Sequence, residues 1–203
     1  MSELSAPIST ADAAWASINT PLNPEELKAF CQDIERLLRI NPMLEFSQWE
    51  SLGDDRYRMA VKNISQETPF ELETELQVEN LDNDIVINYS SGLKNKTVLK
   101  FEPSEHGSRL TIIDDYAGLS DDDRKNRLDE VDKSLTSWAD YLQRFLVLWK
   151  RWSRSAIWRW YMRHVWQPMK PTGRRITYIL LWITVVEIAL VALGVAIYFV
   201  EFA

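Results

Sequence analysis

The chain has 203 residues and a formal net charge of −7, which hides two segments of opposite charge. Residues 1–149 contain 15 Lys and Arg against 28 Asp and Glu, whereas residues 150–175 contain eight Lys and Arg and no acid. The acidic segment repels phosphate backbones, which disfavours a nucleic acid as its partner. The sequence shows no signal-peptide pattern at its start, and its one cysteine, Cys31, cannot form an internal disulfide. A reducing compartment is therefore expected.

Residues 12–149 are numerous enough to form one domain with its own core, and they are predicted to begin with a strand and a helix. Residues 1–11 are expected to be disordered, and residues 13–20 are a candidate strand. Asn23 and Pro24 then give a strong helix start, with Asn at the N-cap and Pro in the first turn. Apolar residues recur at helical spacing until Asn41, which precedes a proline and ends this single predicted helix.

Six strands are predicted to follow as an antiparallel meander, because the links between them are short. Their predicted ranges are 46–51, 56–64, 70–79, 84–89, 97–102 and 109–116. In the third of them, apolar residues and Thr74 alternate with three Glu, one Gln and a final Glu. This alternation is typical of a strand with one buried face and one solvated face.

A long helix is predicted after the strands. Ser120 is followed by three Asp, which is a favourable helix N-terminus. The apolar positions that follow are spaced alternately three and four residues apart; they are Leu128, Val131, Leu135, Trp138, Leu142, Phe145, Trp149 and Trp152. Such a seam packs either on the sheet or against a second copy in a coiled coil. The sheet is the expected partner, because one of its faces must be covered.

This order of elements resembles the helix-grip fold of the START-like, Bet v 1-like and polyketide-cyclase superfamily, over about residues 12–150. The resemblance rests on the region LNPEELKAFCQDIERLLRINPMLEF, the strand GSRLTIIDDY and the closing helix, and it is one of pattern rather than of an invariant motif. It implies an α+β fold in which a curved antiparallel sheet grips a long helix, with a cavity between them for an apolar ligand. The residues expected along that cavity are Phe70, Leu72, Leu76, Val78, Tyr57, Met59, Trp138 and Leu142.

No catalytic residues are assigned from the sequence. His106 and His164 are far apart and, with Cys31, have no metal-ligand spacing, so neither a metal nor a cofactor is expected. Cys31 lies on the apolar stripe of its helix, which favours an inert core thiol over a Cys–His pair. Asp114 and Asp115 end the last strand, and alternation requires one of them to point inward. That acid either contacts a ligand or does acid–base work, or else it is a strand-end acid at the rim of the sheet.

Residues 150–175, the basic segment, mix aromatic and basic side chains. Indole and guanidinium groups both prefer the lipid head-group layer, so this segment is interpreted as a membrane-interface or partner-docking region. The predicted interface residues are Trp152, Arg154, Trp158, Arg159, Trp160, Arg163, Trp166, Arg174 and Arg175. A similar mixture can bind single-stranded nucleic acid, but the neighbouring apolar run favours the membrane. Pro168, Pro171 and Gly173 are expected to interrupt the chain before that run.

Residues 176–200 are predicted to form a transmembrane helix. Fifteen of these 25 residues are Leu, Ile, Val or Phe, and the only formal charge is Glu187. A helix of this length rises about 37 Å, enough to cross a bilayer core with some tilt. The basic segment before it predicts that the head lies in the cytoplasm. Glu187 near the middle of the bilayer indicates contact with another helix, or else an acid that a single anchor tolerates.

Two functions of different kind fit these features best. The first is a non-enzymatic module, tethered to the membrane, that binds a hydrophobic small molecule such as a lipid or quinone at the cytoplasmic face. The second is an accessory or assembly subunit of a larger membrane complex, which would associate with a partner or with itself through the transmembrane helix. A cyclase-like enzyme is a third alternative, although no polar constellation supports it. Membrane lipid is an expected partner in each case, and nucleic acid is not.

Overall fold

The computed structural model describes residues 13–117 and 133–202, which belong to two compact units, Met1–Gln167 and Pro168–Ala203. The second unit contains one helix, α6 (Pro171–Phe202). The elements of the first unit are β1 (Ala13–Thr20), α1 (Pro24–Cys31), α2 (Ile34–Arg39), β2 (Leu44–Gly53), β3 (Arg56–Asn63), β4 (Phe70–Asn80), β5 (Asp84–Tyr89), β6 (Lys96–Ser104), β7 (Gly107–Asp115), α4 (Leu135–Trp152), α5 (Ala156–Tyr161) and the π-helical turn η3 (Met162–Trp166).

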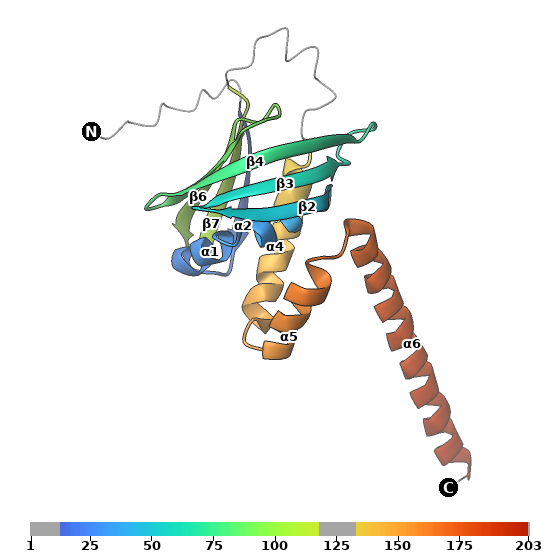
Figure 1. Ribbon diagram of the computed structural model, residues 1–203. Helices are drawn as coiled ribbons and strands as arrows, with labels where there is room; N and C mark the ends of the chain where they lie inside the picture. The colour runs from blue at the N-terminus through green and yellow to red at the C-terminus, as the bar shows by residue number, and fades with distance from the viewer. Residues whose placement is uncertain (1–12, 118–132, 203) are drawn as a thin grey trace. The chain divides into compact units, whose positions relative to one another are not determined.

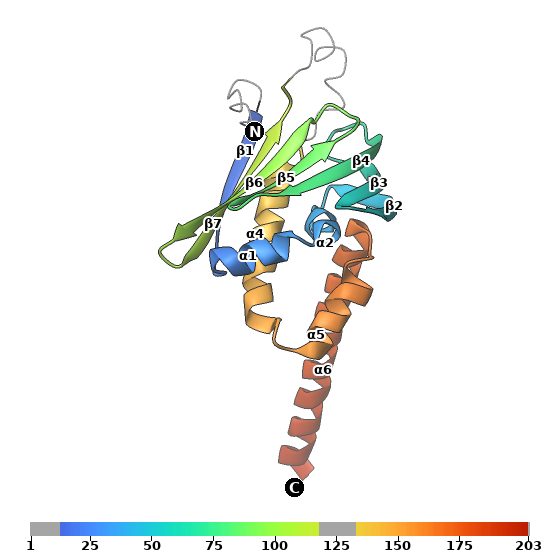
Figure 2. The same cartoon turned by 60° about the vertical axis from the view of Figure 1, so that its left-hand side comes forward.

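The strands form one antiparallel seven-stranded sheet in the order β1-β7-β6-β5-β4-β3-β2. Strands β2 to β7 are therefore a meander, and β1 pairs with the last strand, with Ala13 opposite Asp115 and Thr20 opposite Ser108. Figures 1 and 2 show the sheet curving over α1, α2 and α4, which lie on the same side of it. The predicted α+β helix-grip architecture is confirmed.

The backbone conformation of two turns in the sheet requires the residue types that the sequence has at those positions. In the β2–β3 hairpin, Asp54 and Asp55 have φ angles of 51° and 55°, the left-handed conformation that a tight hairpin requires. In the β6–β7 hairpin, Gly107 has φ 142°, and a Cβ at this position would lie 2.1 Å from the carbonyl oxygen of Thr20. Only glycine lets the start of β7 come this close to the end of β1.

The helix predicted from Pro24 to the residues before Asn41 is wrong in one respect, because the structure contains two helices. Asn23 caps α1 as predicted, since its side chain accepts a hydrogen bond from the Glu26 backbone N–H at 2.7 Å. The chain then breaks after Cys31, and Asp33 caps α2 by accepting from the Arg36 backbone N–H at 3.1 Å. An internal Asp is a good N-cap and a poor mid-helix residue, which is why the break falls there.

Helix α4 covers the sheet with the predicted seam. Its buried residues are Leu135, Trp138, Ala139, Leu142, Phe145 and Leu146. The Trp138 indole donates a hydrogen bond to the Leu37 carbonyl oxygen of α2 at 3.1 Å, which joins the two helices. The seam is thus used inside the domain rather than in a coiled-coil dimer. The predicted start at Ser120 and the first two seam positions lie outside the described residues, and Ser134 is the N-cap of the helix as the structure describes it.

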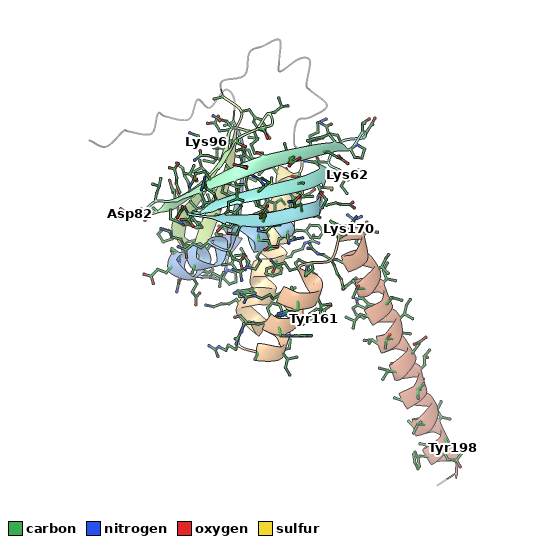
Figure 3. All side chains as sticks on the ribbon, in the orientation of Figure 1. Lys62, Asp82, Lys96, Tyr161, Lys170 and Tyr198 are labelled. Carbon is green, nitrogen blue, oxygen red and sulfur yellow. The ribbon has the colours of Figure 1, made fainter. Side chains whose placement is uncertain are left out.

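Helix α6 contains the predicted apolar run and begins earlier, at Pro171. Residues Pro171–Val200 have a mean hydropathy of 2.5, and this is the one helix in the described ranges that is long and apolar enough to cross a membrane. Its side chains point outward on every side, Tyr198 among them (Figure 3). The expectation that Pro171 and Gly173 interrupt the chain is wrong, because both lie in the first turn of the helix. Proline is tolerated there, since its missing N–H would have no helical partner.

Candidate functional site

A small cavity lies between the sheet and the helices of the first unit. Its volume is about 50 Å³, and its walls come from α2, β3, β4, the β5–β6 loop and α4. The apolar walls are Leu38, Leu44, Met59, Val61, Phe70, Leu72, Leu93 and Trp138. Two amides in the walls have partners: Asn41 donates to the Ser134 hydroxyl at 2.7 Å, and Asn63 accepts from the Ser65 backbone N–H at 2.9 Å.

Four of the eight residues predicted along the cavity line it, namely Met59, Phe70, Leu72 and Trp138. The other four share the inner faces of the sheet and helix without reaching it. Leu76, Val78 and Leu142 are buried in the core, and the Tyr57 ring stacks on Trp49 with 5.3 Å between centroids. Alternation identifies the inward face of a strand, but not where along that face the packing leaves space.

A buried network of polar side chains lies at one end of this cavity. The Asp114 carboxylate is fully buried; its Oδ1 accepts a hydrogen bond from the Thr97 hydroxyl at 2.6 Å, and its Oδ2 lies 2.7 Å from Lys94 Nζ. The Tyr89 hydroxyl is 3.2 Å from Thr97 Oγ1, and Lys94 Nζ lies 5.7 Å from the centre of the Tyr89 ring. Lys94 and Tyr89 line the cavity, so they are among the polar groups that a ligand there would meet.

Both strand-end acids have structural partners. Asp114 points inward as alternation requires, whereas Asp115 faces the other side, 3.6 Å from Lys96 Nζ, and accepts from the Ala117 backbone N–H at 2.8 Å. The sequence indicated that either Asp114 or Asp115 points inward, without deciding between them, and gave no sign of Lys94, because Lys94 lies in the β5–β6 loop. The antiparallel register that brings this loop to the end of β7 becomes known only once the sheet is assembled.

Cys31 is fully buried, and burial raises the pKa of its thiol to about 12. A thiol in this state is protonated at neutral pH and is a core side chain rather than a nucleophile, as its position on the apolar stripe predicts. In residues 13–117 and 133–202, no group of three or more His, Cys, Asp or Glu is placed to hold a metal ion.

The first part of the basic segment folds onto the head, so the predicted boundary at residue 149 falls within α4 and within the first unit. The Trp158 ring lies 5.5 Å from Trp149, and the Trp166 ring lies 5.3 Å from Phe145. These two predicted interface tryptophans are half-buried, whereas Trp152 and Trp160 are 48% and 59% exposed. The predicted interface arginines divide between the two units: Arg154, Arg159 and Arg163 precede Gln167, and Arg174 and Arg175 belong to α6.

No protein-family model matches the sequence, and no curated protein matches it. Solved structures that it resembles include TTHA0849 from Thermus thermophilus, with 16% identity and a TM-score of 0.48, over 65% of this chain and 94% of that one. They also include the polyketide-cyclase-like protein Cgl2372 from Corynebacterium glutamicum, with 18% identity and a TM-score of 0.39, over 71% and 96%. The di-domain aromatase/cyclase StfQ of the steffimycin biosynthetic pathway is similar at 11% identity and a TM-score of 0.47, over 68% of this chain and 51% of that one.

Proposed function

We propose that this chain is a membrane-tethered module whose head binds a hydrophobic small molecule, such as a lipid or quinone, without transforming it. The observation that carries this proposal is the cavity under the sheet, which is mostly apolar and ends at Lys94 and Tyr89. Ligand sites in proteins commonly combine apolar walls with a few fixed polar groups that orient the ligand. The Asp114 carboxylate holds Lys94 in place, so the polar end is pre-organised.

The size of the cavity adds a condition to this proposal. A volume of about 50 Å³ is smaller than the roughly 150 Å³ cavity that holds a benzene molecule. A ring or acyl chain therefore enters only when part of the wall moves outward. Phe70 and Leu72 are the suitable wall residues, because both are only half-buried and lie at the start of β4.

Leu72→Trp is expected to reduce the amount of bound hydrophobic molecule about tenfold, which corresponds to about 1.4 kcal/mol. The larger ring would fill the cavity from its half-open side. The measurement is solvent extraction of the full-length protein, purified in a neutral detergent, followed by mass spectrometry of molecules bound per mole of protein. The matched control is Leu81→Trp, the same substitution at an exposed leucine that does not line the cavity.

Wild type and Leu81→Trp should carry the same molecule at similar occupancy. A wild-type protein that carries no hydrophobic molecule beyond detergent and bulk lipid would contradict the proposal. So would equal occupancy in the Leu72→Trp variant with an unchanged thermal unfolding midpoint.

The second candidate, an accessory subunit that associates through α6, is favoured by Glu187. This acid is the only formal charge in residues 176–200 of α6 and lies near the middle of that run. On the insertion scale, an acid at the centre of a transmembrane helix costs about 3 kcal/mol. Intramembrane acids usually face a partner helix or a polar cavity, and the nearby Ala189, Ala192 and Gly194 would let another helix approach.

Glu187→Leu is expected to leave membrane insertion intact and to reduce co-purification of a partner, or of a differently tagged second copy, by about fivefold or more, on the order of 1 kcal/mol. The measurement is affinity capture from mild detergent with quantitative mass spectrometry. Val186→Leu, the neighbouring position on a different face of the helix, is the control. Undiminished capture of every partner by the Glu187→Leu variant would mean that the acid is tolerated and not used for assembly.

A further inference from the structure

A second cavity lies on the opposite end of α4 from the network around Asp114. Its volume is about 290 Å³, and α2, α4, α5 and η3 all contribute to its walls. Phe145, Trp149, Trp160 and Trp166 provide aromatic surface, while Arg36, Arg159 and Arg163 provide three guanidinium groups. All of these residues belong to the first unit. We call this cavity the arginine pocket.

The charges of the arginine pocket are unbalanced. Asp33 is the one carboxylate in its wall, against three arginines and His164. Asp33 accepts from the Arg36 backbone N–H as the cap of α2 and lies 3.6 Å from Arg36 Nε. For Arg163, the described parts of the chain provide no ion pair and no side-chain hydrogen bond. Arg159 Nη1 donates to the Ser153 carbonyl oxygen at 2.6 Å. The pocket therefore carries a net positive charge, and the donors available in it are those of Arg163 and the other N–H groups of Arg159.

Arg36 is the unusual member of this set, because its side chain is only 13% exposed. Its guanidinium lies 3.9 Å from the centre of the Phe30 ring and 4.8 Å from the Trp149 ring, and Nη2 donates to the Phe30 carbonyl oxygen at 2.7 Å. Its buried Nε has no hydrogen-bond acceptor within the described residues. Burial lowers the pKa of Arg36; Asp33 opposes that shift, and the positive charge of Arg163 adds to it. An anion in the pocket would offset this repulsion.

The number and arrangement of the donors favour phosphate over carboxylate. Guanidinium groups bind both anions through paired hydrogen bonds. The arginines approach the pocket from two sides: Arg36 comes from α2, whereas Arg159 and Arg163, four residues apart, come from the continuous helical run of α5 and η3. A tetrahedral phosphate group presents oxygens in several directions, whereas a planar carboxylate presents two in one plane. The volume suits a head group, with the apolar part of an amphiphile left outside.

We propose that the arginine pocket binds the phosphate group of an anionic ligand, with Arg163 and Arg159 donating to the phosphate oxygens and Arg36 supplying positive charge from the buried wall. On the buried side of the pocket, Phe145 and Trp149 replace water beside Arg36, which strengthens the electrostatic attraction between this guanidinium and an anion. Two sources offer this chemistry: the head group of a membrane phospholipid and a soluble phosphate ester. The site is separate from the cavity under the sheet and does not depend on what that cavity holds.

The test uses the full-length protein in neutral detergent micelles, titrated with phosphatidylglycerol and followed by native mass spectrometry. Arg163→Gln is expected to weaken phosphatidylglycerol binding about tenfold, equivalent to about 1.4 kcal/mol. The matched control is Arg154→Gln, another exposed arginine of the basic segment that does not line the pocket. It should change binding less than about twofold, because it removes the same charge without removing a pocket donor.

The second arm repeats the titration with glycerol 3-phosphate, alone and as a competitor. Competition by the soluble ester at similar concentration identifies a soluble phosphate as the ligand class, and binding of the lipid alone identifies a head-group site. Equal weakening by Arg163→Gln and Arg154→Gln would overturn the proposal, since diffuse attraction to the basic segment would then explain the binding. Failure of the wild type to bind either compound would overturn it as well. Leu72→Trp should leave both titrations unchanged, which separates this proposal from the one for the cavity under the sheet.

Discussion

Lys94→Met is expected to lower the free energy of unfolding of the head by about 3–5 kcal/mol, because it leaves a buried carboxylate without its counter-charge. Asp114 is fully buried, and Lys94 Nζ at 2.7 Å is the charge that compensates its Oδ2. In the described parts of the chain, that oxygen has no aligned hydrogen bond that could replace the ion pair. The measurement is urea unfolding of the full-length protein in neutral detergent, followed by near-ultraviolet circular dichroism.

Two further variants separate the ion pair from general effects of losing a lysine. Lys96→Met removes a cation that lies 3.6 Å from Asp115, whose Oδ1 keeps its backbone hydrogen bond, so a loss of only about 1 kcal/mol is expected. The double variant Lys94→Met with Asp114→Leu should recover most of the stability, because a buried ion pair replaced by apolar groups is often energetically neutral. Asp115 is buried as well, so the two pairs differ in their N–O distance and in the hydrogen bond that Asp115 keeps. Equal losses of stability in Lys94→Met and Lys96→Met would show that the short Lys94–Asp114 ion pair has no special weight.

Removal of α6 is expected to change how the protein is held at a membrane. The full-length chain should stay bound at high salt, whereas the chain without α6 should be released by salt. The fifteen Leu, Ile, Val and Phe residues of 176–200 favour insertion by about 0.3–0.6 kcal/mol each, which exceeds the cost of about 3 kcal/mol for Glu187. A chain of residues 1–170 keeps six cations of the basic segment. Each is worth about 1 kcal/mol near an anionic surface and is screened by salt.

The measurement is flotation with neutral and anionic vesicles at low and high salt. The full-length chain should float with both vesicle types at any salt concentration, and the shortened chain only with anionic vesicles at low salt. Equal flotation of the shortened chain with both vesicle types would show that charge does not cause its binding. Release of the full-length chain by salt would show that α6 does not anchor it in the bilayer. Orientation is checked separately in intact cells, where a cytoplasmic head should not be labelled before lysis. Leu81→Cys is exposed, whereas Cys31 is buried with its thiol pKa raised to about 12, so an impermeant maleimide reports on residue 81 alone.

Local patterns were sufficient to predict the sheet. Short turns separate strands whose side chains alternate, and each strand had to expose one face to the core, which leaves little freedom in the order of a meander. The predicted strand ranges agree with β3, β4 and β5 to within one or two residues. The seam of α4 was equally clear, because its apolar spacing allows only one buried face.

Features that depend on contacts between distant segments could not be predicted in this way. The break at Asp33 arises because its side chain caps α2 more effectively than it fits inside a helix. The packing of Trp158 on Trp149 brings part of the basic segment onto the head, whereas its composition indicated a membrane-interface or partner-docking region. Arg36 shows the same limit, since its spacing on α2 predicts a surface residue and α4 buries it against Trp149. The arginine pocket forms only when α2, α4, α5 and η3 pack together.

The pairing of β1 with β7 also determines when the head can fold during its synthesis. Ala13 pairs with Asp115, which is 102 residues further along the chain, so this pair can form only after Asp115 has been synthesised. At translation rates of about 5–20 residues per second, this wait lasts roughly 5–20 s. Throughout that interval β1 is a nascent strand without a neighbour, and it carries Trp15, whose side chain stays exposed even in the folded head. The apolar residues of α6 are translated only after β7. The sheet can therefore close before the segment that could insert into a membrane leaves the ribosome.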